Sequence, residues 1–149
     1  MNFELSQIAV SLAAYLAPVL PGVVWYEDPN QQGTQTPCAF LQQRYSTITL
    51  KQAGYYYQTI GIDLTYLEEY NLPNLQQLYE QAAGALDQVM ETFPYQDGEE
   101  TALLRTYDRS WSIDLDALHY KFEIRVWVSL PQTVVPMQSM DYTEAIKDG

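Results

Sequence analysis

Residues 55–67 read YYYQTIGIDLTYL, and apolar and polar side chains alternate along most of this stretch. Because successive side chains of a β-strand point to opposite faces of a sheet, the pattern predicts a strand with one buried face. The turn signal Gln52-Ala53-Gly54 stands before it, and the β-prone residues 38–50 stand before the turn. Alternation in residues 38–50 is imperfect, which predicts a bulge or a strong twist. The two segments together predict a long antiparallel hairpin.

A second hairpin is predicted nearer the end of the chain. Residues 118–130 place apolar side chains at even positions and mostly polar side chains at odd positions. The partner strand is expected over residues 103–113, with the turn at residues 114–117. A short strand is also expected at residues 23–26, where a run of apolar residues follows a Pro-Gly turn.

Two helices are predicted from apolar residues at helical spacing. The first follows Asn2, a candidate N-cap, and carries apolar residues at positions 5, 8, 12 and 16. The second is expected to run from near Pro73 to Phe93 over about five turns, where Pro94 ends it.

These elements predict an α+β fold. The simplest packing is an antiparallel sheet of four to five strands, built from two long hairpins, with two helices packed on one face. We expect residues 1–130 to form a single α+β domain. Residues 131–149 follow two breaks at Pro131 and Pro136 and show no sustained apolar period, so they predict an extended C-terminal arm.

The composition opposes binding to nucleic acid. Seven Lys and Arg residues stand against nineteen Asp and Glu residues, which gives a formal net charge of −12. Affinity for nucleic acid depends mainly on basic side chains that neutralise phosphates. The acidic excess suits simple solubility, or a surface along which DNA slides without binding. Thirteen Tyr residues suit half-buried sheet faces and protein interfaces, because a tyrosine is apolar along its body and polar at its tip.

Reactive side chains are scarce. Cys38 is the single cysteine, with no second thiol for a disulfide or a zinc site, and is expected to be a small buried side chain. His119 is the single histidine and is expected to be solvated on the polar face of its strand. Asp114 and Asp116 flank a predicted turn, where Asp is favoured by local hydrogen bonding. The glycines form no phosphate-binding loop. We therefore predict no enzymatic activity, no cofactor and no bound metal.

The sequence also predicts no membrane partner. No apolar stretch approaches the roughly 20 residues that span a bilayer. The first residues, MNFELSQIAV, lack the basic region of a secretory signal, so we expect folding in a reducing cytoplasm.

A family resemblance extends this interpretation and covers nearly the whole chain. The segments that carry it are, in order, the N-terminal helix, Pro21-Gly22-Val23 with Tyr26, Gln32-Gly33, Pro37-Cys38-Ala39-Phe40, Ile62-Asp63-Leu64-Thr65-Tyr66, the long helix and Leu118-His119-Tyr120. Together they resemble the small tail-terminator proteins of long-tailed phages of low-GC Gram-positive bacteria. Phage-like contractile tails derived from such phages carry similar proteins.

The resemblance implies a structural virion protein that forms a hexameric ring on the tail tube. Such a ring stops polymerisation of the tube and offers a joining surface to the head or neck. The implied partners are further copies of the chain, the tail tube protein, the sheath protein of a contractile tail, and the neck or head-completion proteins. DNA would pass through the ring without specific binding. The implied location is the virion tail, assembled in the host bacterial cytoplasm.

Two polar segments are the expected subunit or tube contacts. The loop at residues 27–36 and the arm at residues 131–149 can reach neighbouring subunits and gain order on assembly. Two long hairpins also leave sheet edges that neighbours can extend by strand addition. The candidate interface residues are Tyr26, Gln32, Phe40, Met137, Met140 and Tyr142.

Other interpretations stay open at this point. A neck or head-completion adaptor of the same particle would share the small size and the absence of catalysis. A carbohydrate-binding module is a different class, in which Tyr55-Tyr56-Tyr57, Trp111 and Trp127 would stack on sugar rings. A hydrolase with paired carboxylates would need two acids at a suitable separation.

Overall fold

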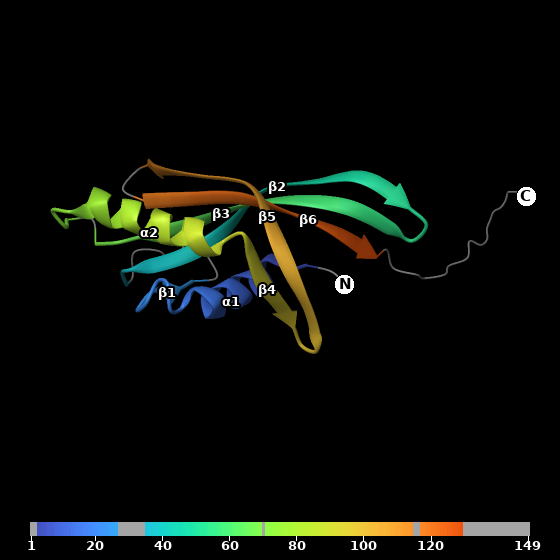
Figure 1. Cartoon of the computed structure of the whole chain (residues 1–149), viewed down its shortest axis with the longest axis horizontal. Helices are drawn as coiled ribbons and strands as arrows, with labels where there is room; N and C mark the ends of the chain where they lie inside the picture. The colour runs from blue at the N-terminus through green and yellow to red at the C-terminus, as the bar shows by residue number, and fades with distance from the viewer. Residues whose placement is uncertain (1–2, 27–34, 70, 115–116, 130–149) are drawn as a thin grey trace, which may run out of the picture.

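The computed structural model describes residues 3–26, 35–69, 71–114 and 117–129, and Figure 1 shows the arrangement of their helices and strands. In chain order the elements are α1 (Leu5–Leu16), β1 (Val24–Trp25), β2 (Cys38–Gln52), β3 (Tyr55–Leu67), α2 (Leu75–Val89), β4 (Thr92–Asp97), β5 (Glu100–Asp114) and β6 (Ala117–Ser129).

The strands form one six-stranded sheet in the order β1-β2-β3-β6-β5-β4. β1 pairs with β2 in parallel, and all other neighbours are antiparallel. The prediction of a purely antiparallel sheet of four to five strands is therefore wrong, although the α+β class holds broadly. The sheet is mixed and curls into a half-barrel, in which the β4–β5 hairpin bends away from the other strands (Figure 1).

The strand that the sequence analysis missed is β4. Phe93 continues the helical period, but α2 ends at Val89, and residues 92–97 pair with residues 100–105 of β5 around a turn at Gly98. Gly98 has φ of +64°, a conformation that glycine adopts without strain. Pro94 is tolerated because β4 lies at the edge of the sheet.

Helix α1 fastens β4 to the rest of the molecule. The backbone N–H of Gln96 donates to Ser11 Oγ over 3.1 Å, and Gln7 Nε2 donates to the Gln96 carbonyl over 2.7 Å. The Tyr15 hydroxyl donates to the Val89 carbonyl at the end of α2 over 2.7 Å. The predicted cap Asn2 lies outside the described residues, and α1 begins at Leu5.

The two predicted hairpins are confirmed. β2 and β3 pair from Cys38↔Leu67 to Gln52↔Tyr55, with irregularities between Gln43 and Tyr45 and between Ile48 and Leu50. These bulges explain the imperfect alternation of residues 38–50. β5 and β6 pair up to Asp114↔Ala117, and β6 also pairs with β3 along its whole length. β3 and β6 therefore form the centre of the sheet.

The helices and one face of the sheet share a single apolar cluster. Helix α1 contributes Ile8, Leu12 and Leu16 with exposed fractions of 0–1%, and β6 contributes its even-numbered residues. Helix α2 adds Tyr79 and Leu86. Full burial of one such side chain is worth roughly 1.5–3 kcal/mol, so this cluster contributes strongly to the stability. We call it the helix-covered face, and the opposite face of the sheet the open face.

Candidate functional site

The open face is not uniformly exposed. Every residue of β3 from Ile60 to Tyr66 is buried, including Asp63 and Thr65, which belong to the open face. A buried carboxylate is costly unless it finds hydrogen-bond partners. The middle of the open face therefore holds a polar network whose members need one another.

Asp63, Thr65 and His119 form the first part of this network. His119 Nδ1 lies 2.9 Å from Asp63 Oδ2, and Thr65 Oγ1 donates to Asp63 Oδ1 over 3.1 Å. A carboxylate accepts hydrogen bonds, so Nδ1 of His119 carries the proton and Nε2 is left for other contacts. The prediction of a solvated histidine is wrong, because His119 is half-buried and paired with Asp63.

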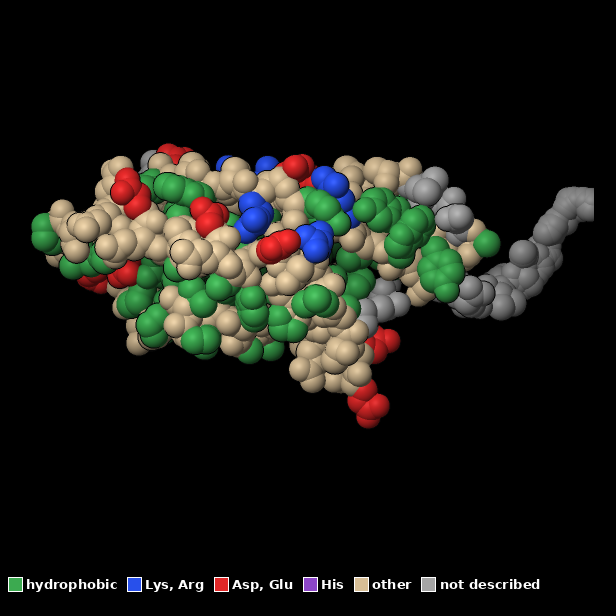
Figure 2. All heavy atoms as spheres, viewed as in Figure 1, with side chains coloured by type: hydrophobic (Ala, Val, Ile, Leu, Met, Phe, Trp, Pro, Cys, Tyr) green, Lys and Arg blue, Asp and Glu red, His purple; other side chains and the backbone are tan. Residues whose placement is uncertain are grey.

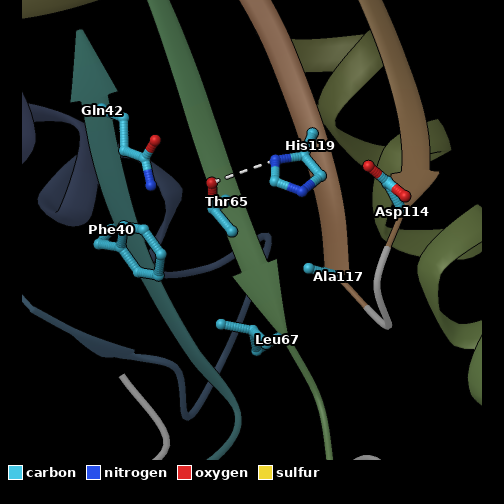
Figure 3. Close-up of a pocket in the computed structure, with 7 residues that line it drawn as sticks. All are labelled: Phe40, Gln42, Thr65, Leu67, Asp114, Ala117 and His119. Atoms are coloured by element: carbon cyan, nitrogen blue, oxygen red, sulfur yellow. Dashed lines mark hydrogen bonds between the residues drawn. The ribbon is translucent and has the colours of Figure 1, made fainter. Parts of the chain in front are cut away.

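A hollow of about 330 Å³ adjoins this cluster. Four strands contribute to it: Phe40 and Gln42 from β2, Thr65 and Leu67 from β3, Asp114 from β5, and Ala117 and His119 from β6. Figure 3 shows the His119 ring between Thr65 and Asp114, with the Phe40 ring on the far side of Thr65. The hollow combines apolar walls with a few polar groups.

The second part of the network lies farther along the open face. Tyr45 packs its ring on Gly61 and donates its hydroxyl hydrogen bond to Glu123. Arg125 Nη2 lies 3.1 Å from Glu123 Oε1 and 3.4 Å from Asp108 Oδ2. These contacts join β2, β3, β5 and β6 across the face.

Each of these contacts favours one charge state. The hydrogen bond from Tyr45 lowers the pKa of the Glu123 carboxyl below its ordinary value of 4.5, and the Arg125 guanidinium adds to the effect. The same hydrogen bond raises the pKa of the Tyr45 phenol. The Arg125 guanidinium also lies over the Tyr107 ring, 4.2 Å from its centroid. The network is therefore stable with Glu123 ionised and Tyr45 neutral.

The hydrogen bonds of the Asp63, Thr65 and His119 cluster differ from those of a catalytic triad. Thr65 Oγ1 lies 3.4 Å from Nδ1 of His119, the nitrogen already held by Asp63, so the cluster lacks the order of a nucleophile, base and orienting acid. Among the residues that the structure describes, no group of three or more His, Cys, Asp or Glu side chains could hold a metal ion. Cys38 is fully buried, as predicted.

Apolar side chains are exposed where the β2–β3 hairpin reaches past the helices. Trp127 is 48% exposed and its ring centroid lies 5.1 Å from that of Tyr57, with Tyr55 beside them in the strand. Figure 2 shows hydrophobic side chains gathered over this end of the molecule, next to Lys and Arg side chains near the crossing of β5 and β6. Trp111 pairs with Tyr120, a residue of the helix-covered face, so the two Trp residues lie on opposite faces and form no common sugar platform.

The structure places two of the predicted interface residues. Tyr26 is half-buried, and its backbone N–H donates to the Ala39 carbonyl over 2.9 Å. Phe40 is 1% exposed and its ring lines the hollow. The remaining predicted interface residues, Gln32, Met137, Met140 and Tyr142, lie outside the described residues. The roles of all six in assembly stay predictions.

Sequence reasoning missed the polar network. Asp63 and His119 stand at odd-numbered positions, like the other open-face residues of their strands. The alternation in the sequence therefore indicated that both lie on the same face of the sheet. The pairing of β3 with β6 brings them together, and that strand order cannot be read from the alternation of either strand alone.

Comparison with known proteins identifies the family. No helix among the described residues is long and apolar enough to cross a membrane. No curated protein matches the chain. A family model described as phage tail terminator protein matches residues 7–136, which is most of the sequence. The chain therefore belongs to a family of phage tail terminator proteins, a structural kind of protein found in the virion tail and associated with other tail proteins.

Proposed function

We propose that this protein caps the phage tail tube as a hexameric ring, stops the tube from growing and offers the surface to which the head or neck attaches. The observation that carries the proposal is the match of residues 7–136 to the tail-terminator family. The exposed aromatic side chains and the hollow of the open face support it, since both offer surfaces for protein contacts.

Tails assembled without the protein test this role directly. Electron microscopy of tails from a deletion strain should show tubes longer than normal, because nothing stops their polymerisation. Supplying the wild-type chain should restore the normal length. Tubes of normal length that lack heads would instead identify a neck or head-completion adaptor.

The ring is tested separately from the capping role. Native mass spectrometry and negative-stain imaging of the purified chain should give a ring of six subunits. A stable monomer, both alone and on isolated tubes, would contradict the proposed ring. The same measurements on mixtures of the purified chain with tail tube protein, sheath protein or neck proteins then identify which of these partners binds the ring.

The loop at residues 27–36 and the arm at residues 131–149 are proposed to make subunit or tube contacts. A chain ending at Leu130 keeps every residue of the described apolar cluster, so it should fold while losing ring formation or tail capping. Circular dichroism and native mass together measure both effects. The double variant Met137→Ser with Met140→Ser should weaken assembly more than Gln138→Ala with Ser139→Ala. A truncated chain that terminates tails at normal length would refute the arm assignment.

We further propose that part of the acidic excess faces the channel through which DNA passes. Asp97, Glu99 and Glu100 gather at the β4–β5 turn, and Figure 2 shows acidic side chains at this projecting tip. Repulsion between these carboxylates and DNA phosphates would keep DNA from binding. Replacing Glu99 and Glu100 by Lys should slow DNA ejection from assembled particles, while Glu80→Lys on α2 should not. Unchanged ejection would leave solubility as the role of the acidic residues.

A further inference from the structure

Two long stretches of strand lack a partner on one side within the described part of the chain. β1 covers β2 only at Cys38 and Ala39, so residues 40–52 have β3 on one side alone. β4 covers β5 over residues 100–105, and the Thr106 N–H donates to the Glu91 carbonyl over 3.0 Å. Residues 107–114 of β5 then have β6 on one side alone. We call these two stretches the β2 edge and the β5 edge.

Exposure distinguishes the two edges from the centre of the sheet. Between residues 42 and 49 of the β2 edge every residue except the half-buried Tyr45 is exposed, and residues 108–112 of the β5 edge are all exposed. In the central strand β3, by contrast, residues 60–66 are all buried. Unpaired backbone N–H and C=O groups on such an edge are a template for another strand.

The positions and directions of the edges fit a head-to-tail contact between copies. In the order β1-β2-β3-β6-β5-β4 the two edges lie on opposite sides of the sheet. β2 runs antiparallel to β3, β3 to β6 and β6 to β5, so β5 runs antiparallel to β2. Rotation about a ring axis to which the strands are tilted, as in a closed barrel, therefore brings the β5 edge of one copy beside the β2 edge of the next in antiparallel orientation and staggers the two copies along their strands. A contact between two different surfaces of this kind generates a ring when the rotation closes.

We propose that the β5 edge of each subunit adds to the β2 edge of its neighbour, so that the sheet continues around the ring. This inference rests on the proposed ring and specifies its subunit contact. A register with Gln52 opposite Tyr107 uses every residue of the β5 edge. In this register the neighbour's β4 lies past the β2–β3 turn of the first subunit. The β1 strand of the first subunit lies past Asp114, where the neighbour's β5 edge ends.

The same register matches apolar and charged positions. It sets Ile48, 55% exposed, opposite Trp111, 39% exposed, and both belong to the helix-covered face. It also brings Arg44 next to Asp114. Opposite charges and aromatic–aliphatic pairs across strands are each worth about 0.2–1 kcal/mol.

Charge also disfavours pairing between like edges. The β2 edge holds two basic residues, Arg44 and Lys51, and no acidic residue. The β5 edge holds Asp108 and Asp114 against the single base Arg109. Two β2 edges, or two β5 edges, would bring like charges together, whereas the mixed pair brings opposite charges together. A second copy of this chain is thus the occupant that the charges favour.

Engineered cysteines test this contact in the full chain. Thr47 and Ser112 lie opposite each other in the proposed register, are exposed and share the open face. Within one copy the two intervening strands hold β2 and β5 roughly 14 Å apart, and Ser112 is level with Phe40 instead of Thr47, so the pair is too far apart for a disulfide. The double variant Thr47→Cys with Ser112→Cys should therefore give, on oxidation, a non-reducing ladder from dimers up to the full ring. Cys38 is fully buried and should leave the wild type without cross-links.

Matched controls separate the outcomes. The pair Thr47→Cys with Thr101→Cys keeps the first substitution and places the second at another exposed position of β5, but Thr101 lies in the part of β5 that β4 covers, and the pair should give no ladder. The two single variants, Thr47→Cys and Ser112→Cys, should cross-link only when mixed, and then only to dimers. Dimers of Thr47→Cys alone would overturn the proposal in favour of like-edge pairing. Rings or capped tails without any Thr47–Ser112 cross-link would overturn it while the proposed function stands, and the absence of rings altogether would count against the proposed function.

Discussion

The ring of Tyr45 lies so close to the backbone of Gly61 that a Cβ added to Gly61 would sit 2.5 Å from the Tyr45 Cε2 atom. Tyr45 occupies the open face of β2 and Gly61 that of β3, where the two are cross-strand partners beside a bulge. The absence of a side chain at Gly61 lets the phenol cross β3 and reach Glu123 on β6. A single glycine thus allows three strands to share one polar network.

Replacing Gly61 by Ala should destabilise the fold. The new methyl group must displace the Tyr45 ring, which breaks the hydrogen bond to Glu123, and overpacking of this kind costs about 1–3 kcal/mol. Urea unfolding measures the free energy of unfolding. Gly84→Ala in α2 is the matched control, since a Cβ there meets nothing within 4 Å and should stabilise the helix by roughly 0.5–1 kcal/mol. Equal free energies of unfolding for Gly61→Ala and the wild type would show that the Tyr45 side chain moves aside without a loss of stability.

The Glu123 network should make stability depend on pH in the acid range. The pKa of Glu123 is lowered in the folded chain, so its contribution is complete above the unfolded pKa, near 4.5, and is lost as the pH falls through the lower folded pKa. Glu123→Gln should therefore lose less stability than the wild type between neutral pH and about pH 3. Urea midpoints at several pH values measure this difference.

Tyr45→Phe is the control for the cause of that pH dependence. It removes the hydroxyl that lowers the pKa of Glu123 most, and should therefore flatten the acid loss of stability in the same direction as Glu123→Gln. A Tyr45→Phe variant with the full wild-type loss would assign the effect to Arg125 instead.

Phe40 and Tyr26 should respond differently to truncation, although both are predicted interface anchors. Phe40 is 1% exposed, and Phe40→Ala should destabilise the monomer by about 3–5 kcal/mol. Tyr26 is half-buried, so Tyr26→Ala should cost less stability and act mainly on assembly. Thermal unfolding and native mass separate the two effects. A Tyr26→Ala variant that forms rings like the wild type would remove Tyr26 from the interface.

The parts of the fold that could be predicted are those set by local patterns. Alternation in residues 55–67 and 118–130, and the turn at Gly54, identified both hairpins because each pattern depends only on neighbouring residues. β4 could not be found in this way, since Phe93 fits the helical period equally well and the strand depends on pairing with β5 and on contacts of Gln96 with α1.

Prediction of the candidate surfaces depends even more on which strands, far apart in the chain, become neighbours in the sheet. The contact of Asp63 with His119 requires β3 and β6 to be neighbours, although a whole helix and two strands separate them in the chain. The two open edges likewise follow from strand order and from the shortness of β1 and β4. No local pattern distinguishes an edge strand such as β2 from a central strand such as β3.

Ile48→Lys should weaken ring assembly if the β5 edge of a neighbour covers this position. Ile48 is 55% exposed in the single chain, and its burial against Trp111 of the neighbour would be worth about 2 kcal/mol, or roughly thirtyfold in the affinity of one contact. Mass photometry over a concentration series measures the shift from ring to monomer. Val10→Lys is the matched control, because Val10 is also 55% exposed but lies on α1, away from both edges. Rings that tolerate Ile48→Lys and dissociate with Val10→Lys would place the subunit contact on the helices instead of the sheet edges.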